Sequence, residues 1–153
     1  MQEAPPTALN LFTYGSLMFE PVWSRLVSGH YPASPATLTG FVRRCVKDDS
    51  YPVIFRGSSS DTVEGVLYRN VTSEDVAVLD AFEGDYYARE AVTLRLPDGS
   101  AFPAQTYVLK DQYRHIADDR EWDAARFSST DIHHFLAQYS GFLVSDRATP
   151  EQP

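Results

Sequence analysis

Residues 63–109 place one helix among strand-like segments, and this order constrains the fold more than any other part of the chain. Residues 63–68 have the β-branched and aromatic content that is typical of a strand. Thr72 and Asp75 then form a capping box, in which the Thr72 hydroxyl and the Asp75 carboxylate are expected to bind the open amides of the first helical turn. The helix is predicted to run to about Glu83, before a glycine that suits a left-handed helix stop.

A β-hairpin is predicted to follow this helix. Residues 86–96 and 101–109 have strand-type content, and Pro97-Asp98-Gly99 between them is a turn signal. The remaining predicted elements are strands at 9–12, 36–46 and 51–56, a helix that Pro21 opens and Gly29 stops, and an amphipathic helix over 131–143. About six strands in largely consecutive order, with about three helices at the crossings, favour an α+β fold over a doubly wound parallel sheet.

The length of the chain fits one domain. With 153 residues, of which 43% are hydrophobic, the chain is long enough to bury a core without metals or disulfides. We expect a single domain over residues 8–147. Residues 1–7 and 148–153 lack apolar periodicity, and they are predicted to be mobile tails.

The charge balance excludes several kinds of partner. With 21 acidic and 13 basic residues the net charge is −8, which disfavours nucleic-acid binding because that binding needs clustered lysine and arginine. The N-terminal segment MQEAPPTALN has no basic or apolar signal region, and no apolar run approaches the ~18 residues of a membrane helix. A single cysteine fits a reducing compartment. These features predict a cytoplasmic protein with no membrane or nucleic-acid partner.

Metal-ligand patterns are weak in this sequence. His133 and His134 are adjacent on a predicted helix, about 100° apart, which is a poor geometry for one metal ion. Cys45 lies in a strand-like run and is expected to be a small buried residue. The sequence therefore predicts no metal site.

The segment Tyr14-Gly15-Ser16-Leu17 is the first candidate for a functional site. It lies between a predicted strand and a predicted helix, and its glycine lets the backbone come close to a ligand. Successive free amides in such a turn can hold a carboxylate or a developing oxyanion. The alternative reading is a tight turn after a strand with no further role.

Glu83 is the second candidate. On a helical projection it falls about 340° from Val76, between Val76 and Leu79, so it lies beside the apolar face. Burial disfavours a charged carboxylate there, and the C-terminal end of a helix disfavours it further, so both effects raise its pKa. The alternatives are a position at the rim of the apolar face or a pairing with Arg89.

A third group belongs to the predicted hairpin. Tyr87 and Arg89 alternate onto one face of the strand that follows Glu83, and Tyr107 projects from the partner strand. These side chains can line a pocket for a polar substrate, or they can serve as ordinary cross-strand packing.

Taken together, these residues resemble the gamma-glutamylcyclotransferase-like superfamily. The branch that looks most similar contains gamma-glutamylamine cyclotransferases and plant avirulence-induced-gene homologues. The segments that carry the resemblance are Tyr14-Gly15-Ser16-Leu17, Tyr51-Pro52, Gly65-Val66-Leu67-Tyr68, Leu79-Asp80-Ala81-Phe82-Glu83-Gly84 with Tyr87-x-Arg89, Ala104-Gln105-Thr106-Tyr107-Val108 and Glu121-Trp122-Asp123.

The resemblance implies a small mixed β-barrel flanked by helices, with a pocket at one mouth. It also implies a transferase that converts a γ-glutamyl amine or γ-glutamyl amino acid into 5-oxoproline without a cofactor. Glu83 would be the general acid/base, and the amides of Gly15, Ser16 and Leu17 would hold the substrate. Three tyrosines would line the pocket: Tyr14, Tyr51 and Tyr107. The alternatives are an acyl or amine transferase acting on another small substrate and a noncatalytic ligand-binding module; the oligomeric state is left open.

Overall fold

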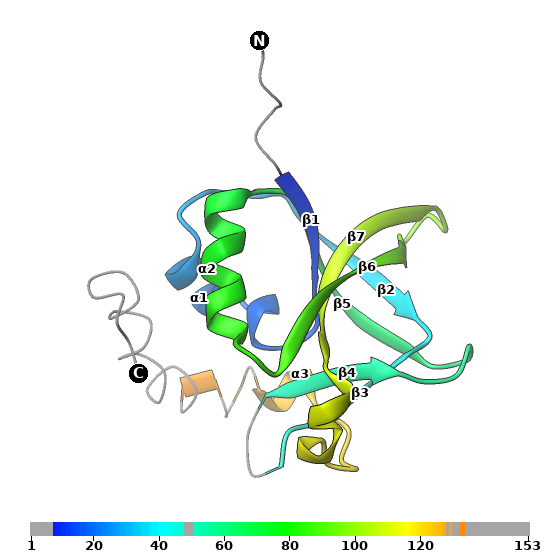
Figure 1. Cartoon of the computed structure of the whole chain (residues 1–153). Helices are drawn as coiled ribbons and strands as arrows, with labels where there is room; N and C mark the ends of the chain where they lie inside the picture. Colours follow the sequence, from blue (N-terminus) through cyan, green and yellow to red (C-terminus); the bar gives the residue numbers. More distant parts are fainter. Residues whose placement is uncertain (1–7, 48–50, 128, 130–131, 134–153) are drawn as a thin grey trace.

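The computed structural model describes residues 8–47, 51–127, 129, 132 and 133. Its main feature is a closed barrel of five strands (Figure 1). In order around the barrel these are β1 (Ala8–Thr13), β5 (Thr62–Thr72), β2 (Ala33–Thr39), β6 (Tyr87–Arg95) and β7 (Ala101–Leu109). All neighbouring pairs are antiparallel except β1 and β7, which close the barrel in parallel. The α+β class and the small mixed barrel are therefore confirmed.

A second, two-stranded sheet lies beside the barrel. It consists of β3 (Phe41–Cys45) and β4 (Pro52–Arg56), which pair antiparallel. The prediction of one continuous strand over residues 36–46 is wrong, because Gly40 has a φ of 92° and separates β2 from β3. Glycine adopts this left-handed conformation without steric cost, so the chain can leave the barrel at this point and begin another sheet.

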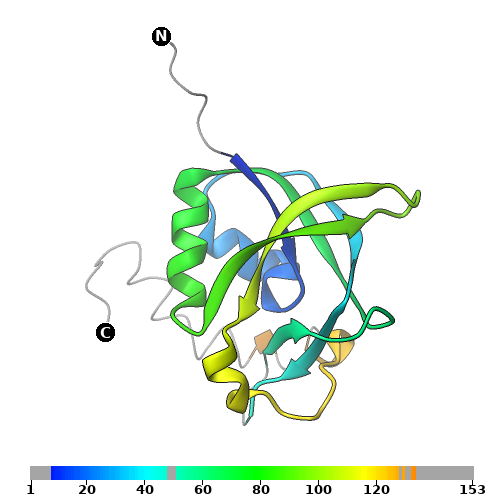
Figure 2. The same cartoon turned by 45° about the vertical axis from the view of Figure 1, so that its right-hand side comes forward.

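Helices α1 (Glu20–Leu26) and α2 (Ser73–Glu83) lie on one side of the barrel (Figure 2). The η1 turn (Ser16–Met18) and α1 follow β1, and α2 connects β5 with β6. After β7 come η2 (Asp111–Ile116) and α3 (Ala124–Arg126), which the sequence did not predict. Of the helix predicted over 131–143 the structure describes only residues 132 and 133, which are helical, and the predicted tails at 1–7 and 148–153 lie outside the described residues.

Both ends of α2 are fixed by local chemistry. The Thr72 hydroxyl accepts a hydrogen bond from the Asp75 amide at 3.3 Å, and Gly84, with a φ of 80°, ends the helix, as predicted. The predicted role of the Asp75 carboxylate is wrong. It is buried against the end of α1, where it accepts hydrogen bonds from the amides of Ser28 at 3.0 Å and Gly29 at 3.1 Å. Because α1 leaves these amides open, Asp75 binds them instead and thereby anchors α2.

The buried hydrophobic residues form three clusters: one inside the barrel, one between the barrel and the helices, and a small one of Val46, Val53 and Leu109. The cluster inside the barrel includes Phe12, Leu38, Leu67 and Leu94. The cluster between the barrel and the helices includes Leu11, Trp23, Leu79, Trp122 and Phe127. Cys45 is buried, as the sequence predicted, and Trp122 is buried too.

Within the described ranges, no helix is long and apolar enough to cross a membrane. The same residues contain no group of three or more His, Cys, Asp or Glu side chains that could hold a metal ion.

Candidate active site

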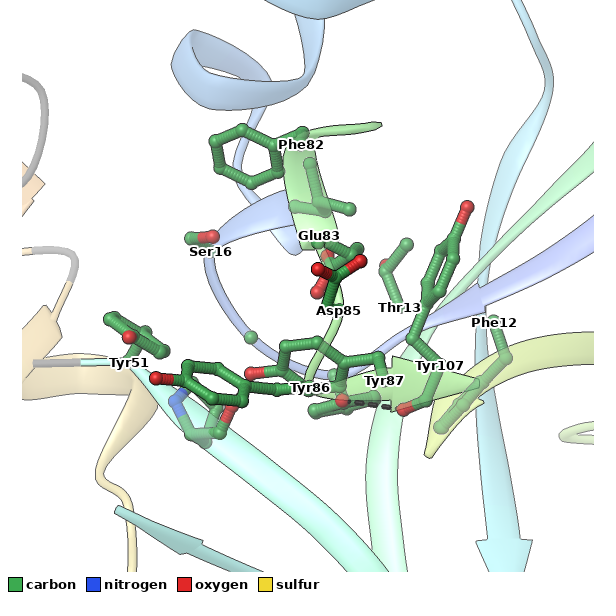
Figure 3. Close-up of a pocket in the computed structure, with 15 residues that line it drawn as sticks. Phe12, Thr13, Ser16, Tyr51, Phe82, Glu83, Asp85, Tyr86, Tyr87 and Tyr107 are labelled. Carbon is green, nitrogen blue, oxygen red and sulfur yellow. Dashed lines mark hydrogen bonds between the residues drawn. The ribbon is translucent and has the colours of Figure 1, made fainter. Parts of the chain in front are cut away.

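One mouth of the barrel contains a pocket with a volume of about 350 Å³ (Figure 3). Its wall is formed by the end of β1 and the turn after it, the C-terminal end of α2, the segment that leads into β6, the start of β4 and Tyr107 on β7. The structure brings together here all the residues that the resemblance assigns to a site: Tyr14, Gly15, Ser16, Leu17, Tyr51, Glu83 and Tyr107. Of the hairpin residues, Tyr87 lines the pocket and Arg89 does not.

The turn after β1 presents its backbone to the pocket. The carbonyl oxygen of Gly15 accepts a hydrogen bond within the turn, from the Met18 amide at 2.9 Å. Among the described residues, the amides of Gly15, Ser16 and Leu17 donate no hydrogen bond, so they remain available to a ligand. A glycine is required at the first of these positions, because a Cβ atom there would lie 2.7 Å from Cδ of Pro52.

Arg43 on β3 holds this turn from behind. Its Nη1 donates to the carbonyl oxygen of Tyr14 at 2.8 Å and to that of Glu64 at 3.0 Å. Its guanidinium lies over the Trp122 ring, 5.2 Å from the centroid. Burial lowers the pKa of Arg43 from its ordinary value, but an arginine remains charged at any physiological pH. This contact could not be predicted from local sequence patterns, because β3 and the turn are far apart in the chain.

Glu83 is the last residue of α2, and its carboxyl group reaches the pocket. The residue is half-buried, and burial together with the nearby negative charge of Asp80 raises the pKa of the carboxyl to about 8. No group in the described part of the chain donates a hydrogen bond to this carboxylate. Such a group exchanges a proton near neutral pH, which is the property that a general acid/base needs.

Arg89 pairs with Asp80 and not with Glu83. Its Nη1 donates to Asp80 Oδ1 at 2.6 Å, and its Nε donates to Gln105 at 2.8 Å. The Tyr107 hydroxyl donates to the same Asp80 oxygen at 2.7 Å. Asp80 therefore pairs with Arg89, and among the described residues the pairing of Glu83 with Arg89 that the sequence left open is not formed. The helical spacing of Asp80 and Glu83, three residues apart, was the signal that could have revealed this cluster.

Two of the pocket tyrosines are connected to each other. The Tyr14 hydroxyl donates to the Tyr107 carbonyl oxygen at 2.6 Å, and both residues are buried. Burial raises the pKa of Tyr14 well above its ordinary value and also raises that of Tyr107, and in both cases a nearby carboxylate adds to the rise. Both phenols therefore stay protonated near neutral pH and remain hydrogen-bond donors.

Comparison with known proteins agrees with this geometry. A model of the family described as gamma-glutamyl cyclotransferase, AIG2-like, matches residues 11–124. The chain belongs to this family. A similar relative is AIG2-like protein D of Arabidopsis thaliana, which is 37% identical over 142 residues, covering 89% of this chain and 90% of the relative.

Solved structures of similar proteins share the fold of this gamma-glutamyl cyclotransferase, AIG2-like chain. A solution structure from Arabidopsis thaliana superposes with a TM-score of 0.63 at 27% identity, covering 95% of this chain and 94% of that one. A protein named gamma-glutamyl cyclotransferase superposes with a TM-score of 0.58 at 21% identity, covering 68% of each chain. At that identity the second likeness bears on the fold alone.

The rim of the pocket in this family member contains residues that the sequence did not single out. Asp85 and Tyr86 follow α2 and are exposed, and Phe82 is half-buried beside them. The Tyr86 ring packs edge-on against Tyr113, with 4.6 Å between the centroids. The described lining residues include two carboxylates, Glu83 and Asp85, and no lysine or arginine.

Proposed function

We propose that this protein is a cyclotransferase that releases 5-oxoproline from a γ-glutamyl compound, with Glu83 as general acid and base. The substrate carries its own nucleophile, the α-amine, and its own electrophile, the γ-carbonyl carbon. Glu83 takes a proton from the α-ammonium group, and the freed amine forms a C–N bond with the γ-carbonyl carbon. The bond to the leaving nitrogen then breaks as Glu83 returns that proton to this nitrogen, and the second proton that the ring nitrogen must lose passes to the released amine, which leaves as an ammonium ion. The products are 5-oxoproline and a free amine or amino acid.

The single observation that supports this chemistry best is the Glu83 carboxyl, with a pKa of about 8, in a pocket that also contains the turn with open amides. Ring closure within one molecule needs neither an external nucleophile nor an electron carrier, so the proposed reaction uses no cofactor. It needs orientation, which can be worth roughly 7–11 kcal/mol, and proton transfer.

The remaining lining groups fit supporting roles. The amides of Gly15, Ser16 and Leu17 would bind the α-carboxylate of the substrate or the oxyanion that develops on the γ-carbonyl oxygen. Tyr14, Tyr51 and Tyr107 would enclose the glutamyl group and exclude water. The pocket lining contains the Asp85 carboxylate and, among the described residues, no lysine or arginine. This charge favours a leaving group without a carboxylate, so the preferred substrate is a γ-glutamyl amine rather than a γ-glutamyl amino acid.

A substrate panel tests this function. We expect 5-oxoproline release from one or more γ-glutamyl amines, and slower release from γ-glutamyl amino acids and from glutathione, whose leaving groups carry a carboxylate. Release is measured by separating 5-oxoproline from the reaction mixture and quantifying it. Binding of γ-glutamyl compounds without release would favour a noncatalytic module, and turnover of other acyl compounds alone would favour a different transferase.

The activity should depend on pH through Glu83. Since the base form is the carboxylate, kcat/KM should rise with pH along a limb whose apparent pKa lies near 8. Asp80→Asn removes the negative charge that helps to raise the pKa of Glu83, so this limb should move to lower pH. Asp111→Asn removes an exposed carboxylate outside the pocket and should leave the limb in place. An identical profile in the Asp80 variant and the wild type would contradict the assignment.

A further inference from the structure

The pocket of the candidate active site contains open amides but no described cation. In the proposed reaction the substrate brings an α-carboxylate, and the described lining includes no lysine or arginine to balance that charge. Arg43 on β3 is not among the lining residues, but it binds the carbonyl group of Tyr14 in the turn that follows β1. A positive charge therefore lies one peptide group away from the open amides.

Arg43 lies at the point where β1 and β5 separate. The register of the two strands ends with the pair Thr13 and Val66. Beyond this pair, Nη1 of Arg43 donates to the carbonyl oxygen of Tyr14 at 2.8 Å and to that of Glu64 at 3.0 Å. One guanidinium nitrogen thus joins the two backbones, so the Tyr14 carbonyl group is held in a fixed direction.

The direction of this carbonyl group sets the direction of the Gly15 amide. The two groups belong to one trans peptide, in which the C=O and N–H bonds point in opposite directions. Because the Tyr14 oxygen faces Arg43, the Gly15 N–H points away from Arg43, and no described residue accepts a hydrogen bond from it. Gly15 lines the pocket, so this amide is placed to bind a ligand there.

The charge of Arg43 strengthens the same amide as a donor. A hydrogen bond from a cation to the carbonyl oxygen polarises the whole peptide group, so its N–H becomes more positive. Arg43 forms no ion pair with any described residue, and the carboxylates of Glu64 and Glu121 act on it only at longer range. The Trp122 ring covers the guanidinium group, 5.2 Å from its centroid. The charge therefore remains available to the peptide.

We propose that Arg43 is a positioning residue for substrate binding, which acts through the Tyr14–Gly15 peptide. It directs the Gly15 amide into the pocket and strengthens it as a donor to the α-carboxylate of the substrate. Arg43 does not touch the substrate, and the peptide group carries its effect. This inference rests on the proposed function, because that function supplies the carboxylate.

Two matched ligands test this role without turnover. They are 5-oxoproline, the product of the proposed reaction, and its carboxamide, which has the same ring and no negative charge. Dissociation constants are measured by ¹H–¹⁵N NMR titration, with the Gly15 amide signal as the reporter. The wild type should bind 5-oxoproline more tightly than the carboxamide, and 5-oxoproline should shift the Gly15 amide signal.

Variants of Arg43 separate its charge from its packing. Arg43→Met keeps a long apolar side chain beside Trp122 but removes the charge. The preference for 5-oxoproline over the carboxamide should therefore fall about two- to tenfold, the range of one hydrogen bond. Arg43→Lys keeps a charged donor and should retain most of the preference. Arg44→Met is the matched control, because Arg44 is the next residue on β3 and does not line the pocket, so this variant should keep the full preference.

Three outcomes would overturn the proposal. The first is a folded Arg43→Met variant with the preference of the wild type; if this variant does not fold, Arg43→Gln replaces it with the same expected loss. The second is an equal loss in Arg43→Lys and Arg43→Met, which would assign a packing role to Arg43. The third is the absence of a Gly15 shift when 5-oxoproline is added to the wild type.

Failure of the proposed function gives a different result. A wild type that binds 5-oxoproline with this dependence on Arg43, but releases none from γ-glutamyl compounds, would contradict the cyclotransferase activity and leave the role of Arg43 intact. A wild type that turns over γ-glutamyl compounds, together with an Arg43→Met variant that keeps its preference for 5-oxoproline, would contradict only the role of Arg43.

Discussion

Replacement of Glu83 by glutamine should reduce 5-oxoproline release by about 10²–10⁴-fold, the usual contribution of a positioned proton-transfer group. Glutamine has nearly the same shape as glutamate, but its amide cannot accept the proton of the α-ammonium group. The pocket and α2 should be unchanged, because no described residue donates a hydrogen bond to the Glu83 carboxylate. Release is measured under single-turnover conditions, with circular dichroism as the check on folding.

The stability of the same variant separates loss of chemistry from loss of structure. Because the folded protein holds the Glu83 proton more tightly than the unfolded chain, the wild type loses stability as pH rises from about 4.5 to about 8. The glutamine variant does not lose this stability. The difference in melting temperature, variant minus wild type, should therefore grow as the pH rises through this range. Near-wild-type turnover in a folded variant would remove Glu83 from the mechanism.

Replacement of Gly65 by alanine should cause a large loss of stability. A Cβ atom at this position would lie 2.2 Å from the carbonyl oxygen of Thr13 and 2.6 Å from Cζ of Phe12. The Thr13 oxygen belongs to the backbone of β1, so it cannot move without separating β1 from β5 in the barrel. We expect the free energy of unfolding to fall by about 3 kcal/mol, at the upper end of the usual cost of overpacking. Urea unfolding measures this change.

Gly99→Ala is the matched control for this variant. Gly99 has a φ of 90° at the tip of the β6–β7 hairpin, and a Cβ atom there would meet no other atom within 4 Å. The substitution therefore carries only the cost of a left-handed conformation, roughly 1–2 kcal/mol. Equal losses in the two variants would show that the close approach of β1 and β5 is not what requires glycine at position 65.

Local signals in the sequence were sufficient for α2 and for the hairpin after it. Thr72 and Gly84 mark the ends of α2, and Pro97-Asp98-Gly99 marks the turn between β6 and β7. These features depend on groups only a few residues apart, so the sequence order alone determines them.

Pairing between distant segments was not accessible in the same way. The change of sheet at Gly40 and the parallel pairing of β1 with β7 depend on which strands meet in three dimensions. A glycine within a strand-like run is consistent with either a bulge or a break, so residues 36–46 could be read as one strand.

In the candidate site, too, local features could be predicted from the sequence and contacts between distant segments could not. The position of Glu83 beside the apolar face of its helix was visible in the helical periodicity, and it correctly indicated a raised pKa. The binding of Arg89 and Tyr107 to Asp80 was not visible, because it joins α2 to two strands of the barrel. That cluster occupies the nearby cation and leaves Glu83 unpaired among the described residues.

The most direct test of the role of Glu83 is a titration of its side chain by ¹³C NMR, with the carboxyl signal assigned by comparison with the Glu83→Gln variant. This measurement requires no choice of substrate. Burial and the charge of Asp80 predict a titration midpoint near 8. A midpoint near the ordinary value of 4.5 would contradict the assignment, because such a carboxylate would be a weak base and would hold no proton to return to the leaving nitrogen.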